Sequence, residues 1–185
     1  MTKIYTKTGD TGETTLLGGK RVKKSCMEMV AIGEVDELNA AVGFLIGLLA
    51  DDQSVEVVKE KLTSVQHTLF TVGANLAAAQ TKLVKVPELK EENIKELEDW
   101  IDAMETELPE LTQFILPGGA PASAQSFIAR AICRRTERQV VGFAEKYPRL
   151  NPVIQQYLNR LSDALFVVGR WINRQVGIEE VTWKK

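Results

Sequence analysis

Apolar residues recur every three to four positions along four long stretches and one shorter stretch after the first 24 residues of the chain. This period lines one face of an α-helix with side chains that a core can bury. It predicts five helices, at about 25–50, 54–79, 87–108, 121–147 and 151–177. The longest would reach close to 40 Å at ~1.5 Å per residue, the scale of an up-and-down bundle. The expected fold class is therefore all-α.

Turn and cap residues separate the predicted helices. The polar stretch 51–53 links the first two, which should then be antiparallel. The Pro-Gly-Gly run at 117–119 forces a turn, and Pro121 suits a first helical turn. Asn151 is predicted to cap the last helix and Gly177 to end it. The third helix should lie on the surface with one apolar stripe, formed by Ile94, Leu97, Ile101, Met104 and Leu108.

The first 24 residues follow no helical period and are predicted to form an irregular loop that could bind an anion. Backbone amides beside glycine can approach an anion closely, and neighbouring lysines add positive charge. The loop is not a Walker A motif, because Thr14 stands where its first glycine is needed and Arg21 follows Lys20. A flexible cap without a ligand is the alternative. We expect one domain over 1–185, with the loop at 1–24 and the bundle at 25–177.

Length and composition narrow the class of protein. The chain of 185 residues suits one core, and its formal net charge of -2 argues against a nucleic-acid binder. The longest apolar run, 44–50, is far short of the roughly 20 residues that a membrane-spanning helix needs. We therefore expect a soluble, cytoplasmic protein without a membrane partner. Its cysteines, Cys26 and Cys133, should stay reduced and hold no zinc.

Asp36 is unusual in the first predicted helix, because it shares a face with apolar and small residues. Glu34 and Glu37 lie off that face and can meet water. A carboxylate on a packed face needs a cationic or hydrogen-bonding partner, so Asp36 would mark a functional site. A solvated aspartate at a frayed edge is the alternative. The other residues of the face are Met29, Ile32, Gly33, Ala40, Gly43 and Gly47.

The fourth predicted helix offers such a partner. Arg130, Arg134 and Glu137 fall within an arc of about 60°, and Ser123 lies on the same arc. Two guanidiniums beside one carboxylate can hold a phosphate chain, while the glutamate orients them or faces a metal ion. A salt-bridged, solvated surface explains the spacing equally well.

Other candidate residues carry weaker signals. The last helix has a polar side that contains Asn159, Ser162, Asp163 and Arg170. Asn159 could bind a ribose or a phosphate, although an exposed polar face explains the same pattern. By their positions alone, Phe114 is interpreted as a core residue and His67 as a structural histidine.

The chain also carries five blocks in a particular order: TKTGDTGETTLLGG with RVKK, then GEVDELNA, FILPGG, RAICRRTERQ and YLNRLSDALF. Together they resemble the PduO-type ATP:cob(I)alamin adenosyltransferases, from Ile4 to about Arg174. The resemblance implies a ferritin-like five-helix bundle that assembles as a homotrimer, with ATP between neighbouring subunits and the corrinoid beside it. It implies transfer of the 5′-deoxyadenosyl group of ATP to the cobalt of reduced cobalamin, with release of triphosphate. Mg2+ would be the metal, and a reductase and a cobalamin-dependent enzyme would be the partners.

The resemblance further assigns roles to residues. Phe114 matches the aromatic on the lower axial side of the corrin, and Asp36 and Arg130 match an ion pair beside it. Asp163 joins this corrinoid-binding group, and Glu137 lies near the magnesium and triphosphate. The catalytic group comprises Arg134, Asp36, Arg130 and Phe114. The ATP-binding group comprises Thr6, Lys7, Thr8, Gly9, Thr14, Thr15, Lys24, Arg134, Arg135, Glu137, Arg138 and Asn159.

Two departures from the family pattern concern the shape of the substrate pocket. Ser126 and Phe127 stand where relatives often carry a histidine and an aliphatic residue, and the usual aromatic before Gly33 is missing. Two other interpretations remain open: a non-enzymatic helical adaptor or nucleotide-binding bundle, and a different ATP-dependent transferase or phosphatase. Binding of Mg-ATP tests the first, and analysis of the products tests the second.

Overall fold

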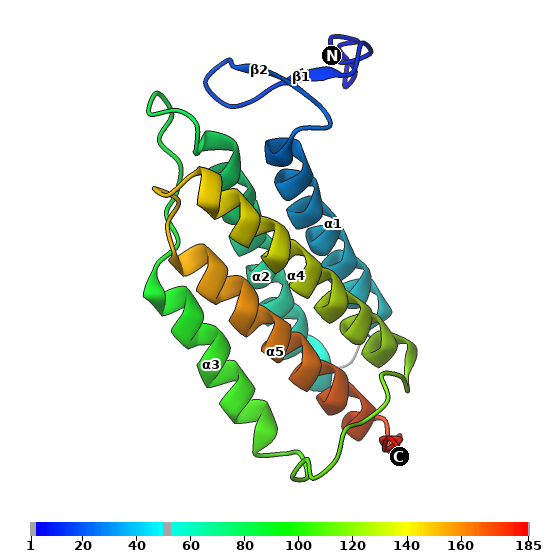
Figure 1. The fold of residues 1–185 in the computed structure, drawn as a ribbon. Coiled ribbons are helices and arrows are strands. Elements are labelled where there is room, and N and C mark those ends of the chain that lie inside the picture. Colours follow the sequence, from blue (N-terminus) through cyan, green and yellow to red (C-terminus); the bar gives the residue numbers. More distant parts are fainter. Residues whose placement is uncertain (1–2, 50–52, 185) are drawn as a thin grey trace.

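The computed structural model describes residues 3–49 and 53–184. Within these ranges the chain forms five helices and one two-stranded sheet (Figure 1). None of these helices is long and apolar enough to cross a membrane. The predicted all-α, five-helix fold is confirmed. The elements are β1 (Glu13–Thr15), β2 (Arg21–Lys23), α1 (Met27–Leu48), α2 (Gln53–Ala78), α3 (Glu91–Glu105), α4 (Pro121–Lys146) and α5 (Val153–Gln175).

The helix ends follow local hydrogen bonding. Asn151 Oδ1 accepts a bond from the Val153 N–H at 3.0 Å, which confirms its predicted capping role. Gly177 has φ 70°, a left-handed conformation that ends α5 as predicted. α3 starts later than predicted because its capping box joins the Lys90 N–H to Asn93 Oδ1, at 3.0 Å. In the predicted turn 51–53, positions 51 and 52 lie outside the described residues.

α4 lies at the centre of the arrangement, packed against α1 on one side and α5 on the other. α2 packs against α1 and lies behind α4 in Figure 1, and α3 packs against α5. Trp100, which the predicted stripe of α3 omitted, is buried together with Leu97 and Met104. Leucine is the most frequent residue of the core, with Leu38, Leu62, Leu69, Leu158 and Leu165 among its members.

Short polar side chains join α4 to α5 inside the bundle. Ser123 Oγ donates to Gly169 O at 2.8 Å, and Ser126 Oγ donates to Leu165 O at 2.7 Å. Ser123 lies on the same α5-facing side of α4 as Arg134, as predicted, but its side chain is buried between the two helices. Phe127 is also buried, and a Cβ on Gly169 would lie 3.0 Å from its ring. Ser126 and Phe127, two of the residues that depart from the family pattern, therefore lie in the core of the chain.

The N-terminal loop is more ordered than predicted, since it contains an antiparallel hairpin. Thr14 pairs with Val22 in β1 and β2, and Gly18 and Gly19 turn the chain between them with positive φ. Strands of three residues are too short to show alternation in the sequence. The Gln80 side chain donates to Leu17 O at 2.5 Å, so the hairpin is attached at the end of α2.

Candidate functional site

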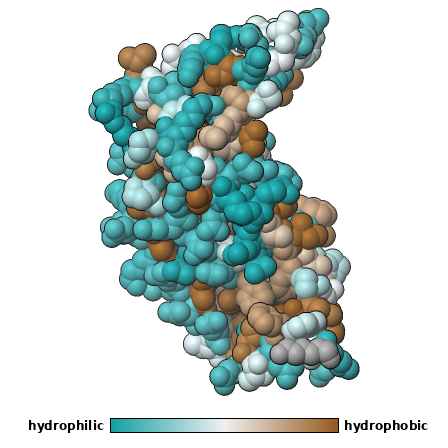
Figure 2. All heavy atoms as spheres, viewed as in Figure 1, coloured by the Kyte–Doolittle hydropathy of each residue, from teal (hydrophilic) through white to brown (hydrophobic). Residues whose placement is uncertain are grey.

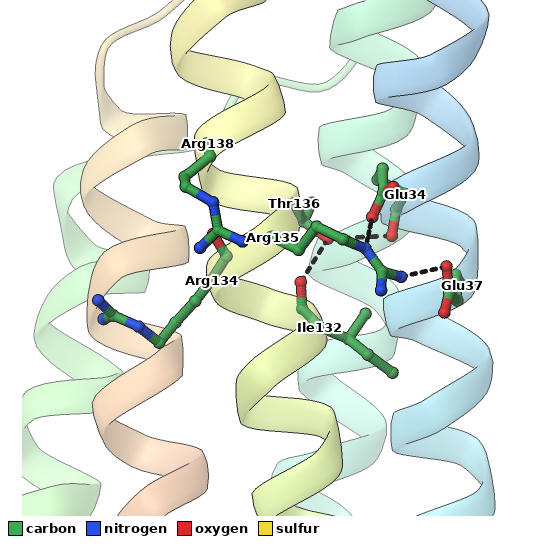
Figure 3. Close-up of polar contacts among 7 residues, drawn as sticks. All are labelled: Glu34, Glu37, Ile132, Arg134, Arg135, Thr136 and Arg138. Carbon is green, nitrogen blue, oxygen red and sulfur yellow. Dashed lines mark hydrogen bonds and ion pairs between the residues drawn. The ribbon is translucent and has the colours of Figure 1, made fainter.

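An open pocket of about 310 Å³ lies on α4, lined by Arg134, Glu137, Arg138 and Val141. Asn159 of α5 donates from Nδ2 to Glu137 Oε1 at 3.0 Å, so the predicted glutamate and asparagine do meet. Arg138 Nη1 donates to the carbonyl of Arg134 at 2.9 Å. Figure 3 shows both arginines on the side of α4 that faces α5. The pocket thus presents two guanidiniums and one carboxylate to solvent, a set that can bind a polyphosphate.

Arg135 points away from this pocket and toward α1 (Figure 3). Its Nε donates to Glu34 Oε2 at 2.6 Å, and its Nη2 donates to Glu37 Oε2. These bonds, the one to Glu34 first, raise the pKa of Arg135 above its usual value. The assignment of Arg135 to the ATP site is not supported by this geometry, because neighbouring residues on a helix point about 100° apart.

The prediction that Asp36 faces a packed side was wrong for the single chain. Asp36 is exposed, as are Gly33 and Ala40 on the same face of α1. Arg130 is half-buried, and its guanidinium lies 5.5 Å from the centre of the Phe166 ring. Among the described residues, no ion pair joins Asp36 to Arg130.

Phe114 is not a core residue, because 78% of its surface is exposed. It lines a cavity of about 670 Å³ together with Leu111, Trp183 and Lys184. The rings of Phe114 and Trp183 meet edge to face, with centres 6.4 Å apart. A cavity with an exposed aromatic pair suits a large, flat ligand.

Sequence reasoning missed the C-terminal segment that brings Trp183 to this cavity. Thr182 bridges to Ile115, and the Trp183 N–H donates to Phe114 O at 2.7 Å. The Leu116 N–H donates to Val181 O at 2.8 Å. The apolar residues in VTWKK were the available signal, but so short a run predicts no element by periodicity.

The N-terminal residues assigned to ATP lie away from Glu137 within the chain. The hairpin extends beyond the start of α1 (Figure 1). Among the described residues, the side chain of Gln80, just after α2, donates a hydrogen bond to the hairpin at Leu17 O. Lys24 lies over Gly9, where an added Cβ would be 3.1 Å from its Nζ. Lys7 has φ 58°, an uncommon conformation for a residue with a side chain. The other predicted members are Thr6, Thr8, Thr14 and Thr15, of which all but the half-buried Thr14 are exposed.

The polar side predicted for α5 is divided in the structure. Asn159 and Asp163 are exposed, and Asp163 Oδ2 accepts a bond from Arg160 Nη1 at 3.1 Å. Ser162 and Arg170 are instead buried. The structure therefore leaves Asp163 available to a ligand and removes Ser162 and Arg170 from the exposed face.

The remaining candidates show no reactive arrangement. His67 is exposed on α2, not enclosed in the bundle. Both cysteines are free, and burial raises the pKa of the Cys133 thiol. Within the described ranges, no group of three or more His, Cys, Asp or Glu side chains is arranged to hold a metal. Any magnesium would need ligands from a bound phosphate chain as well as from Glu137.

Comparison with known proteins gives consistent matches over nearly the whole chain. The family described as cobalamin adenosyltransferase matches residues 4–172. A cobalamin adenosyltransferase from Cupriavidus metallidurans is 43% identical, over 100% of this chain and 96% of that protein. A corrinoid adenosyltransferase from Bacillus subtilis is 40% identical, over 99% of this chain and 93% of that protein.

A solved structure is similar in fold as well. It is a PduO-type ATP:corrinoid adenosyltransferase from Lactobacillus reuteri, a variant with phenylalanine replaced by alanine, complexed with cobalamin and ATP. Its TM-score is 0.92 at 33% identity, and the match covers 99% of this chain and 100% of that one.

Proposed function

Because this chain belongs to the cobalamin adenosyltransferase family and catalyses ATP-dependent adenosylation of a corrinoid, we propose that two of its pockets divide the reaction. The pocket lined by Arg134, Glu137 and Arg138 binds the triphosphate of ATP. The cavity beside Phe114 binds the corrin ring. The contact between Asn159 and Glu137 is the observation that supports this division most strongly, since it joins two predicted ATP-binding residues from different helices.

The chemistry is a displacement at C5′ of ATP. The Co(I) ion of the substrate donates an electron pair to C5′, the C5′–O bond breaks, and triphosphate leaves with the bonding pair. Co(I) is a strong nucleophile, so the protein must align the two substrates and stabilise the departing charge. Arg134 and Arg138 provide positive charge for the triphosphate, and Asn159 holds the Glu137 carboxylate in position.

Magnesium would accompany ATP and neutralise part of its negative charge. Mg2+ in proteins is often bound by one or two carboxylates together with substrate phosphates and water. Glu137 supplies such a carboxylate at the pocket. Asn159 donates to its Oε1, so Oε2 would be the oxygen that faces the metal.

Phe114 would face the lower side of the corrin ring. An exposed aromatic ring in this position excludes water or a lower ligand from the cobalt, which favours the square-planar reduced state. Trp183 extends the same apolar wall. Asp163 lies on α5 as a further polar residue available to the corrinoid.

We also infer a homotrimer in which ATP lies between neighbouring chains. Large apolar side chains are exposed on α1 and α4, with Phe44 at 60% and Ile128 at 54%. Brown and pale surface gathers at the lower right of Figure 2, where the lower ends of α1 and α4 and the C-terminus lie in Figure 1. Burying such surface against a second copy would bring the N-terminal loop to a neighbour's α4 and could pair Asp36 with Arg130 across the interface.

The enzyme would work in the reducing cytoplasm, which its two free cysteines support. Because Co(I) must be generated by reduction, a reductase should supply its substrate. A cobalamin-dependent enzyme would receive the product.

An anaerobic assay with chemically reduced cobalamin and Mg-ATP tests the proposal. Adenosylcobalamin should form, as followed by its spectrum, with one triphosphate released per turnover. A helical adaptor would give neither product nor heat of Mg-ATP binding in calorimetry. Phosphate or diphosphate in place of triphosphate would indicate a different ATP-dependent transferase or a phosphatase.

A further inference from the structure

Arg170, on α5, is a buried arginine with 4% of its surface exposed. Its guanidinium binds Glu180 through both carboxylate oxygens, Nε to Oε1 at 2.7 Å and Nη2 to Oε2 at 3.1 Å. The same Nη2 donates to the carbonyl of Pro109 at 2.9 Å. One side chain therefore connects α5 to two segments that lie 71 positions apart in the sequence, at 109 and 180.

These two segments form the walls of the cavity that contains Phe114. The connection between α3 and α4 supplies the stretch 111–114, and the C-terminal segment supplies Trp183 and Lys184. In addition to Arg170, backbone hydrogen bonds near Ile115 and the ring contact of Phe114 with Trp183 join the two walls.

The C-terminal segment has little apolar burial of its own to hold it in place. Val176, Ile178 and Val181 are all exposed, and so is Trp183. The ion pair, with two hydrogen bonds between the buried Arg170 and the half-buried Glu180, is thus a principal attachment of the segment to the helices. A buried guanidinium without its carboxylate partner is energetically costly. Substitution of Glu180 should therefore shift the backbone of this region.

We propose that Arg170 and Glu180 are positioning residues for the corrinoid cavity, and that they fix the separation of Phe114 from Trp183. The inference rests on the proposed placement of the corrin ring beside Phe114. Neither Arg170 nor Glu180 lines the cavity of Phe114. Their effect passes through the two walls, so it should fall on corrinoid binding and leave the ATP pocket on α4 unaffected.

The variant Glu180→Gln tests the pair with little risk to folding, because it keeps the size of the side chain and lies outside the helices. Loss of the charge-assisted bonds should raise the KM for the corrinoid by ~10- to 100-fold, with the KM for ATP within about twofold. Arg170→Lys keeps the charge but loses the two-pronged contact, so it should give an effect in the same direction.

An ion pair between a buried carboxylate and an exposed lysine, at the C-terminal end of α4, provides the control. Glu28 is as buried as Arg170 and pairs with Lys146 at 2.9 Å. Glu28→Gln should lower stability without changing the KM for the corrinoid. A second readout comes from Trp183 as the sole tryptophan, in a background carrying Trp100→Phe and Trp171→Phe. There, Glu180→Gln should increase quenching of Trp183 by acrylamide.

The outcomes separate the two claims. If the unmodified enzyme makes no adenosylcobalamin, the proposed function fails. If the unmodified enzyme is active, and Glu180→Gln has the same KM for the corrinoid and the same quenching of Trp183 as its parent, the positioning role is wrong. A fall in stability shared with Glu28→Gln, without a selective change in corrinoid KM, would likewise overturn it.

Discussion

Asn159 Nδ2 donates to Glu137 Oε1 at 3.0 Å, and this bond links α5 to α4 at the rim of the arginine pocket. It orients the carboxylate beside Arg134 and Arg138, the groups proposed to bind the triphosphate. Substitutions at Asn159 or at the arginines should therefore change the binding of ATP.

Asn159→Ala should weaken ATP use with little effect on the corrinoid. A charge-assisted hydrogen bond contributes about 1.5 to 3 kcal/mol, so the KM for ATP should rise roughly 10- to 100-fold. Steady-state kinetics with each substrate varied in turn will measure it. Equal changes in both KM values would instead indicate general disruption of the α4–α5 contact.

Arg134 and Arg135 are adjacent in the sequence but should behave differently. Arg134→Ala should raise the KM for ATP, because its side chain lines the pocket. Arg135→Ala should lower the melting temperature and leave the KM for ATP nearly unchanged, because its guanidinium binds Glu34 and Glu37. Glu34→Gln is the matched variant and should resemble Arg135→Ala. Loss of ATP affinity in Arg135→Ala with unaltered stability would contradict this distinction.

Phe114→Ala should slow turnover of the corrinoid by roughly tenfold or more, since a ring that excludes a lower ligand is worth at least ~1.4 kcal/mol if it acts as proposed. Phe70 is similarly exposed, on α2, and lies outside both pockets, so Phe70→Ala is the control. The spectrum of bound cob(II)alamin reports the lower ligand directly. Identical spectra and rates for the two variants would remove Phe114 from the corrinoid site.

Stability should fall in acid because of Glu28. The hydrogen bond from Tyr147, and then that from Lys146, lowers the pKa of Glu28 from 4.5 to about 2. A lowered folded pKa stabilises the protein above the unfolded value, and this contribution disappears as the pH falls from about 4.5 to about 2. The loss should be roughly 3 kcal/mol at ~1.4 kcal/mol per unit. Denaturant unfolding at several pH values will measure it.

Glu28→Gln removes the titrating group and should be less stable at neutral pH with a flatter dependence on acid. Tyr147→Phe removes the largest cause of the lowered pKa and should move the loss toward higher pH. Parallel acid curves for the wild type and Glu28→Gln would show that Glu28 is not responsible.

The sequence predicted the helices well because the apolar period extends over many residues, as in α4 and α5. It could not separate Arg134 from Arg135, since the partner Glu34 lies 101 residues away and only packing of α1 on α4 brings them together. Asp36 shows a related limit. Periodicity identifies a face of small residues but does not tell whether the same chain or another copy covers it. The C-terminal segment was missed because its pairing with Ile115 depends on tertiary contacts.

Complementation in mixed oligomers tests most directly whether one chain's arginine pocket and another chain's N-terminal loop together bind ATP. One variant carries Arg134→Ala, and the other carries Lys7→Ala with Lys24→Ala; at an ATP concentration near the KM of the wild type, each should have little activity alone. In a trimer refolded from equal amounts, a site is intact when an unaltered loop meets an unaltered α4, so ~25% of wild-type activity should return. If the mixture stays as inactive as its components, ATP is not bound between chains in the proposed way.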